Sequence, residues 1–381
     1  MVLQVLSSGV DTLHGSMRGT VRTDLWELGH EAQQRARDGD LEPVELGDTG
    51  QAFNVQGHGI RGYGLWMSSR DWELMLTQSE RFPAALAQLH SAYLHSMGVA
   101  PAVKLVEQTL RRAVMARAEA FTVSRIDIYA DVQGWSLDLE HLHQFVSRSR
   151  VRRAFLDGYE EVPAARAGDQ VFAMGRRVTG FVFGTGSSLL CRIYDKTKEI
   201  QRRKEHWLVD LWGEPVAEDP VWRVEFQIRR PVLVDHGLRT VDETLDGLQD
   251  LWRYCTHRWL TYRAPRPDAR ERRWPLDPVW EDMQAVRISP TEIGVVRRRV
   301  EEADELQLVQ VLGGYATSLA ALKGWRGLDE TLEHVGPILL RYLESRGRTW
   351  EAEVVRKRAR RMSVSGWLDD DQVPGDEEDA A

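Results

Sequence analysis

Three short runs of the sequence carry residue types that could do chemistry on a phosphodiester. They are Arg125-Ile126-Asp127, Arg192-Ile193-Tyr194 and Arg223-Val224-Glu225. Each run pairs an arginine with an acid or a tyrosine two residues later, across a β-branched residue. Side chains of an extended strand alternate between its two faces, so the two polar residues of each run would point the same way. If all three runs lie in one sheet, that face presents a nucleophile, metal ligands and phosphate clamps.

Tyr194 is the candidate nucleophile. A tyrosine hydroxyl has an ordinary pKa of about 10 and attacks poorly at neutral pH unless a cation or a base lowers that pKa. Lys196 shares the strand face of Tyr194 and Arg192 flanks it on the other side, so both are expected to supply positive charge. The alternative is an exposed edge tyrosine beside a helix start. Asp195 is expected to face the other way or to cap the following helix.

Asp127 and Glu225 are the candidate metal ligands, and Asp131 is a further one. A hard cation such as Mg²⁺ or Mn²⁺ takes one or two carboxylates together with phosphate oxygens. Two carboxylates on one sheet face repel each other unless a cation or arginines neutralise them. Structural pairs between arginines and these acids would meet the same requirement, so both alternatives stay open for either acid alone. Three arginines could stabilise charge on a pentacovalent phosphate: Arg125, Arg192 and Arg223.

The run His141-Leu142-His143 has the histidine–hydrophobic–histidine pattern by which one class of nicking enzymes binds its metal. Here it lies in a stretch with helical spacing, where residues i and i+2 diverge by about 200°. We therefore expect that these two histidines do not share a metal.

The composition fits a globular protein with two or three domains. The chain has 381 residues, of which 42% are hydrophobic and 28% charged. No apolar run approaches the roughly 18 residues that would span a bilayer, and no signal pattern opens the chain. Two cysteines, Cys191 and Cys255, cannot make a disulfide framework or a zinc site alone, so we expect a reducing, cytoplasmic location without membrane contact.

The net charge of -8 is unevenly placed along the chain. Residues 362–381 hold seven acids and no basic residue, and they are expected to be a disordered acidic tail. Without those seven of the 58 acids, the remainder nearly balances the 50 basic residues. Arginine clusters in that remainder suit contacts with phosphate, so DNA is not excluded as a partner.

Alternating and helical spacings predict an α+β fold with a mainly antiparallel central sheet that carries the site, flanked by helices and followed by a helical C-terminal segment. Strands are expected over 121–132 and 221–228, and a hairpin over 178–194 with a turn at Gly184-Thr185-Gly186. Helices are expected over five further stretches: 71–97, 101–119, 136–150, 196–212 and 241–262. The domain prediction is a catalytic nicking domain over 1–262, a Pro/Arg-rich linker over 263–278, a helical domain over 279–361 and the tail over 362–381.

These motifs resemble the replication initiation factor family, which comprises tyrosine-type initiators of rolling-circle replication in plasmids and related relaxases of mobile elements and phages. The resemblance rests on SRIDIYAD (124–131), LLCRIYDKTKE (189–199) and VWRVEFQIR (221–229), in that order. GVDTLHGSMRG (9–19) also fits the family's opening strand. The similarity covers roughly residues 9–260 and leaves the C-terminal helical segment without a match.

The resemblance implies a single-strand nick at an origin. The tyrosine stays on the 5′ phosphate, and the free 3′ hydroxyl primes synthesis or transfer. By match to the YDK motif the nucleophile is Tyr194, and Asp127 and Glu225 are the metal-binding pair. The implied partner is origin DNA, single-stranded or cruciform with flanking duplex, and a host helicase and a homodimer are further expectations.

Two alternatives stay open from the residues. In the first, Asp127 and Glu225 activate water in a metal-dependent nuclease and Tyr194 is structural. In the second, the chain is a non-catalytic origin-binding regulator whose acids are salt-bridged.

Overall fold

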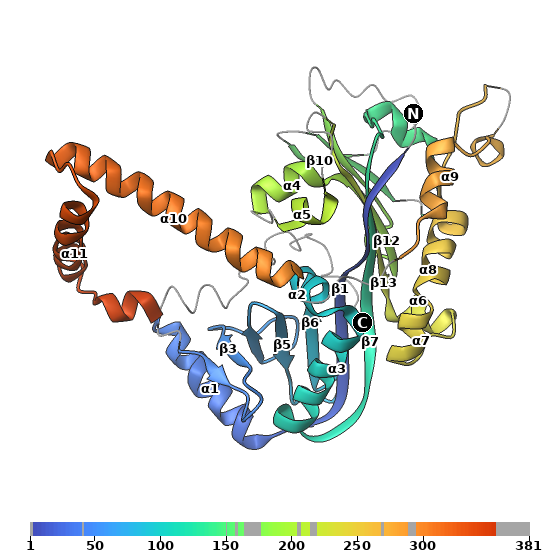
Figure 1. The fold of residues 1–381 in the computed structure, drawn as a ribbon. Helices are drawn as coiled ribbons and strands as arrows, with labels where there is room; N and C mark the ends of the chain where they lie inside the picture. The colour runs from blue at the N-terminus through green and yellow to red at the C-terminus, as the bar shows by residue number, and fades with distance from the viewer. Residues whose placement is uncertain are drawn as a thin grey trace. The chain divides into compact units, whose positions relative to one another are not determined.

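The computed structural model describes residues 3–39, 42–149, 151–156, 159–163, 177–203, 207–213, 219–267, 270–288 and 295–355 (Figure 1). The predicted acidic tail lies outside these residues. The chain divides into two compact units. Unit 1 comprises Met1–Ser16, Gln88–Leu105 and Ala120–Arg297, and unit 2 comprises Met17–Ala87, Val106–Glu119 and Arg298–Ala381. No helix in the described part of the chain is long and apolar enough to cross a membrane.

Unit 1 is built on a sheet in the order β10-β9-β11-β12-β13-β7-β1. β1 and β7 are long strands that continue into unit 2. The strands of this sheet are β1 (Gln4–Val21), β7 (Met115–Gln133), β9 (Arg152–Leu156), β10 (Tyr159–Pro163), β11 (Val178–Phe183), β12 (Leu189–Asp195) and β13 (Trp222–Arg229). A separate antiparallel pair is formed by β8 (Phe145–Ser147) and β14 (Leu260–Tyr262).

Helices cover both faces of the unit 1 sheet, with α4 and α5 on one side of β12 and β13 and α6 to α9 on the other (Figure 1). The helical elements are α2 (Ser91–Met97), α3 (Val99–Thr109, which continues into unit 2), the 3-10 helix η2 (Leu139–Gln144), α4 (Lys196–Arg203), α5 (Trp207–Trp212), α6 (Arg230–Asp235), α7 (Val241–Asp246), α8 (Leu248–Tyr254), the π-helix η3 (Cys255–Trp259), the 3-10 helix η4 (Glu271–Arg273) and α9 (Pro278–Ala285).

The apolar core of unit 1 lies between the sheet and the layer of α8, η3 and α9. Alternate residues of β13 point into it, and Phe226 packs edge-on against Trp252 with ring centroids 5.5 Å apart. Trp252 and Trp280 are fully buried, and their indole N–H groups donate to the backbone carbonyls of Met283 and Thr256. Because one face of each central strand is used for this core, its polar residues lie on the other face.

Unit 2 contains the smaller strands β2 (Val44–Glu45), β3 (Ala52–Val55), β4 (Leu65–Ser68), β5 (Trp72–Leu76) and β6 (Ala85–Leu89, which ends in unit 1). They continue from β1 in the order β6-β5-β4-β3-β2. Its helices are α1 (Thr23–Arg37), the π-helix η1 (Leu110–Val114), α10 (Val295–Lys323, whose first three residues fall in unit 1) and α11 (Leu328–Glu344).

The predicted α+β class is confirmed: a large antiparallel sheet is flanked by helices, and helices follow it. The predicted hairpin is confirmed as β11 and β12, and the predicted strand over 221–228 is β13. The predicted helix over 71–97 is wrong over its first part, where β5 and β6 lie, and only its end is helical, as α2. A short, nearly continuous apolar run such as Trp72–Leu76 fits a buried strand as well as a helix, and every residue of β5 is buried.

Three further helices end earlier than predicted. The stretch 101–119 gives way to β7 at Met115, and the stretch 241–262 ends at Trp259, before β14. The stretch 136–150 is only the 3-10 helix η2, with Asp138 at its N-cap, followed by β8. Residues 263–278 make local contacts that include a bridge between Arg263 and Leu276, and α9 belongs to unit 1. The predicted domain boundaries at 262 and 278 stay predictions.

Candidate active site

Strand register brings the three sequence runs together on one face of the unit 1 sheet. β12 and β7 pair antiparallel with β13 on either side, so Tyr194 stands opposite Arg223, and Arg223 opposite Asp131. In the same way Arg192 stands opposite Glu225, and Asp127 opposite Gln227. Directly opposed residues share a face. The prediction that these side chains meet on one sheet face is confirmed.

Tyr194 is hydrogen-bonded to an acid in this face. Its hydroxyl donates to Oε2 of Glu225 at 3.0 Å. Across the hairpin its partner is Gly180, at which an added Cβ would come within 3.1 Å of the Tyr194 Cβ. A glycine there leaves room beside the phenol ring. The arrangement gives Tyr194 a carboxylate to receive its proton.

The expected cationic lowering of the Tyr194 pKa is wrong for this structure. Burial, followed by the negative charges of Glu199 and Glu225, raises the pKa of Tyr194 well above its ordinary value, and Arg223 only partly opposes them. The ammonium of Lys196 is paired with Glu199 and lies 5.7 Å from the centroid of the Tyr194 ring. The nearby cations are therefore engaged by acids, and the phenol is protonated at neutral pH.

Glu225 lies among other carboxylates. Burial and the negative charge of Asp11 raise the pKa of Glu225 to about 7, although Arg192 acts in the opposite direction and donates to Oε1 at 3.4 Å. Asp127 adds to the repulsion. A carboxylate in this environment can accept a proton near neutral pH.

Asp127 is held by Arg125, its neighbour two residues along β7. Nε and Nη2 of Arg125 donate to Oδ1 and Oδ2 of Asp127 at 2.9 and 2.6 Å. The side chain of Asp127 is 2% exposed and that of Arg125 is 16% exposed. Asp127 is therefore neutralised by an arginine, which is one of the two alternatives that the sequence left open. Each oxygen of its carboxylate still has a second lone pair for another ligand.

Asp131 and Arg223 form a fully buried bidentate pair. Arg223 donates from Nε and Nη2 to the two oxygens of Asp131 at 2.7 and 2.8 Å, and its guanidinium lies 4.0 Å from the ring centroid of Tyr129. The indole of Trp212 donates to the same carboxylate at 2.9 Å. With three donors on Asp131 and no exposure of Arg223, the pair fits a positioning role better than the predicted metal ligand and phosphate clamp.

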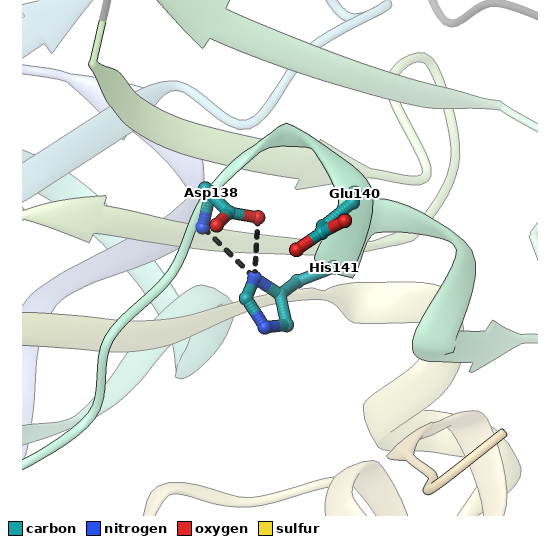
Figure 2. A group of neighbouring side chains, drawn as sticks. All are labelled: Asp138, Glu140 and His141. Atoms are coloured by element: carbon teal, nitrogen blue, oxygen red, sulfur yellow. Dashed lines mark hydrogen bonds and ion pairs between the residues drawn. The ribbon is translucent and has the colours of Figure 1, made fainter.

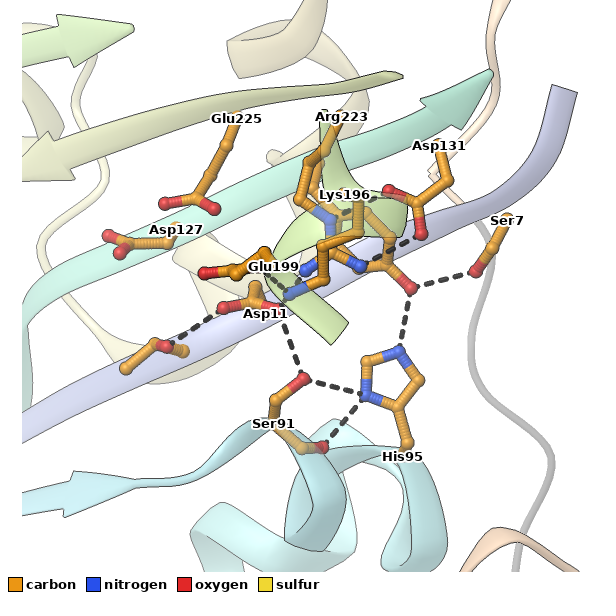
Figure 3. Close-up of polar contacts among 12 residues, drawn as sticks. Ser7, Asp11, Ser91, His95, Asp127, Asp131, Lys196, Glu199, Arg223 and Glu225 are labelled. Carbon is orange, nitrogen blue, oxygen red and sulfur yellow. Dashed lines mark hydrogen bonds and ion pairs between the residues drawn. The ribbon is translucent and has the colours of Figure 1, made fainter. Parts of the chain in front are cut away.

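Asp11 on β1 is an acid of this face that the sequence reasoning missed. Its Oδ1 accepts from Nη1 of Arg223 at 2.5 Å and from the hydroxyl of Ser91 at 3.0 Å (Figure 3). Burial alone would raise the pKa of Asp11, but the positive charges of Arg223 and then Lys196 outweigh it and hold that pKa below its ordinary range. Asp11 is therefore ionised at neutral pH.

A chain of hydrogen bonds continues from this acid to helix α2. The Nδ1 of His95 donates to the carbonyl of Ser91 at 2.8 Å, so its Nε2 accepts from the hydroxyl of Tyr129 at 2.7 Å (Figure 3). The hydroxyl of Ser7 lies 2.8 Å from that of Tyr129. Burial lowers the pKa of His95, so the ring is neutral. The network ties α2 to β1, β7 and β13 beneath the site.

The start of α4 supplies the remaining polar groups. Lys196 is the first residue of this helix, and it pairs with Glu199 one turn on. Asp195 accepts from the backbone N–H of Lys198 at 3.2 Å, which confirms its expected capping role.

Three acids on three strands could hold a divalent cation here: Asp11, Asp127 and Glu225. Hard oxygen donors of this kind suit Mg²⁺ and Mn²⁺, and the mutual repulsion among these buried carboxylates is the condition that a cation relieves. Figure 3 shows their side chains on the same side of the sheet. The ligand types therefore fit the predicted metal, with Asp11 in the place that the sequence assigned to Asp131, but the ligand atoms of these three acids are not all within 4.8 Å of one another, so a cation would have to draw them together.

A second group, Asp138, Glu140 and His141, lies at η2 (Figure 2). Within the described residues this is the one set whose candidate ligand atoms all fall within 4.8 Å of each other. The Nδ1 of His141 accepts from the backbone N–H of Asp138 at 3.0 Å, as part of a capping box. Both acids are exposed, and the local contacts explain the group as a helix cap. His143 also lies on η2, so both histidines are in a helix, as predicted.

Comparisons with known proteins leave the family open. No protein-family model matches the chain, and no curated protein matches it. Among solved structures, the chain is similar to the rolling circle replication initiator protein from Geobacillus stearothermophilus, with 15% identity and a TM-score of 0.45. The match covers 76% of this chain and 100% of that one.

Proposed function

We propose that the chain nicks one strand of DNA at an origin through a covalent bond between Tyr194 and the 5′ phosphate. The observation that carries this proposal is the hydrogen bond from the Tyr194 hydroxyl to Glu225, inside a group of carboxylates flanked by arginines. A phenol aimed at a carboxylate with a pKa of about 7 has a base for its proton.

The bond changes balance as follows. As the phenolic proton passes to Glu225, the Tyr194 oxygen forms a bond to phosphorus and the bond from phosphorus to the 3′ oxygen breaks. The 3′ oxygen leaves with the electron pair and is protonated by water, which yields a free 3′ hydroxyl. The partly exposed guanidinium of Arg192, with Arg125 beside Asp127, supplies positive charge for the phosphate oxygens.

Asp127 and Glu225, with Asp11, would hold Mg²⁺ or Mn²⁺ at this site. A bound cation would neutralise the carboxylates and polarise the non-bridging phosphate oxygens. Arg223 and Asp131 position the strands that carry these acids, and Lys196 fixes Glu199 at the start of α4. DNA is the partner that this chemistry requires, whereas the helicase contact, the homodimer and the cytoplasmic location stay predictions.

A metal-dependent nuclease is the second candidate, and the raised pKa of Tyr194 favours it. In that reaction the carboxylates activate water and Tyr194 is structural. A non-catalytic origin-binding regulator has no comparable observation in its favour.

The test uses supercoiled DNA and single-stranded oligonucleotides that carry the sequence flanking the gene, incubated with Mg²⁺ or Mn²⁺. With a label at the 3′ end of the oligonucleotide, the proposal predicts a protein adduct that survives denaturation and is absent in Tyr194→Phe. Tyr254→Phe on α8, behind the sheet, is the matched control and should form the adduct. If Tyr194→Phe still nicks while Glu225→Gln does not, the water nuclease is correct instead. Binding without any cleavage would support the regulator.

A further inference from the structure

Two arginines face each other on the same side of the sheet as Tyr194. Arg229 ends β13 and stands opposite Arg125 of β7. Arg229 is two residues beyond Gln227 and four beyond Glu225, so all three residues share a face. Directly opposed like charges destabilise an antiparallel pair. The repulsion between these two arginines would be relieved by a negatively charged group bound beside them, such as a phosphate.

The two arginines differ in how they are neutralised. Arg125 has the carboxylate of Asp127, with two short hydrogen bonds. Arg229 is exposed, and its guanidinium makes no ion pair within the described part of the chain. A third cation, Arg192, is 34% exposed in its side chain and reaches Glu225 and Gln227 only at 3.4 Å. Positive charge is therefore in excess at this end of the face.

Exposure rises along β13 toward the same end. Arg223 is fully buried and Glu225 and Gln227 are each 3% exposed, whereas Arg229 is exposed. At about 3.3 Å per residue, Arg229 lies roughly 20 Å along the strand from the position opposite Tyr194. That distance exceeds the reach of a single phosphate, so Arg229 cannot serve the one that Tyr194 attacks.

We propose that Arg192 and Arg229, with Arg125 opposite Arg229, form a track that binds successive backbone phosphates of a single DNA strand leading away from Tyr194. This inference rests on the proposed function, because it takes the strand that reaches Tyr194 and continues it along β13. Arginine suits the role because its planar fork donates two hydrogen bonds to a phosphate. The binding is independent of base sequence, since backbone contacts carry no sequence information.

The test is the salt dependence of binding, measured by fluorescence anisotropy with a labelled 20-nucleotide single strand of mixed sequence, in EDTA so that no cleavage occurs. Each phosphate contact contributes about -0.7 to the slope of log affinity against log salt for a single strand. Arg229→Gln should weaken binding and make that slope shallower by about this amount. Arg229→Lys should restore most of the slope, because the charge is kept.

The matched control is Arg258→Gln, an exposed arginine of η3 in the helical layer behind the sheet. It should leave the slope unchanged, and thermal unfolding of all three variants checks that they are folded. An unchanged slope in Arg229→Gln, or an equal change in Arg258→Gln, would overturn the track. A larger change with the duplex than with the single strand would overturn its assignment to a single strand.

The result is separable from the nicking reaction. If Tyr194 forms the adduct but Arg229→Gln keeps the full slope, the track is wrong and the proposed function stands. If no adduct forms and the slope still falls, the track stands as a binding surface on a protein that does not nick.

Discussion

The hydroxyl of Tyr194 donates a 3.0 Å hydrogen bond to Oε2 of Glu225, from the strand next to its own. The two residues stand on diagonal positions of β12 and β13, and a long phenol reaches across this spacing. Each residue alone has an ordinary structural explanation. Together they place a phenol within hydrogen-bond reach of a proton acceptor, which is the geometry that the proposed nicking reaction requires.

Replacing Glu225 should remove the proton acceptor. We expect Glu225→Gln to lower the rate of adduct formation by about 10²- to 10⁴-fold, the range by which a positioned base accelerates a reaction. Single-strand binding in EDTA should persist, since the variant retains the arginines. The exposed Glu281 of α9 provides a control, Glu281→Gln, that should react at the normal rate. Normal adduct formation by Glu225→Gln would remove Glu225 from the reaction.

Removing a carboxylate should raise the metal requirement. EDTA should abolish nicking, and we expect Asp127→Asn and Asp11→Asn each to need at least about 10-fold more Mg²⁺ or Mn²⁺ for half-maximal rate, since the loss of a group that only orients a ligand already costs this much. Asp138→Asn at η2 tests the other acidic group and should leave the requirement unchanged. The reverse pattern, in which only Asp138→Asn raises the requirement, would move the metal site to η2.

The buried pair of Arg223 and Asp131 should stabilise the fold. Asp131→Asn removes one of the two carboxylates that neutralise the buried Arg223 and leaves Asp11, so it should lower the free energy of unfolding by up to about 3–5 kcal/mol, measured by chemical denaturation. Asp250 and Arg253 form an exposed pair at 3.6 Å, and Asp250→Asn should hardly change stability. Equal small effects at both positions would mean that Arg223 is not held by this contact.

His95 should make stability depend on pH. Its pKa is lowered by burial, while in the unfolded chain it returns to about 6.5, so the unfolded state binds more protons between these values. The stabilising contribution is therefore present above about pH 6.5 and is lost as pH falls toward the lowered value. The midpoint temperature of thermal unfolding should fall further between pH 7 and pH 5 for the wild type than for His95→Gln. His143→Gln replaces an exposed histidine and is the control, whose midpoint temperature should fall as much as that of the wild type. An equal fall in His95→Gln would contradict the attribution of this pH dependence to His95.

Much of the site could be predicted because strand alternation is a local property. Once 124–131, 189–195 and 221–229 are strands, the period of two places Asp127, Tyr194 and Glu225 on faces opposite to their apolar neighbours. The register then brings those faces together. The spacing of the apolar residues was the deciding signal.

The residues that were missed come from contacts over long sequence separations. Asp11 and Arg223 are separated by 212 positions, and Ser91 and Asp11 by 80. The local sign of Asp11 is an acid between Val10 and Leu13, inside the run 9–19 that resembles the family's opening strand. His95 lies in the stretch 71–97, for which one long helix is predicted. In the structure, the short helix α2 brings His95 to the hydroxyl of Tyr129. The buried pairing of Arg223 with Asp131 follows from their facing positions, which the sequence alone cannot supply.

The covalent bond to Tyr194 is the central claim, and mass spectrometry of the adduct tests it most directly. The oligonucleotide is incubated with the protein and Mg²⁺ or Mn²⁺, the adduct is digested with nuclease and protease, and the modified peptide is sequenced. We predict a nucleotide 5′ phosphate on the peptide that contains Tyr194, and on that residue. A phosphate on another residue, or nicked DNA with a free 5′ phosphate and no modified peptide, would contradict the account.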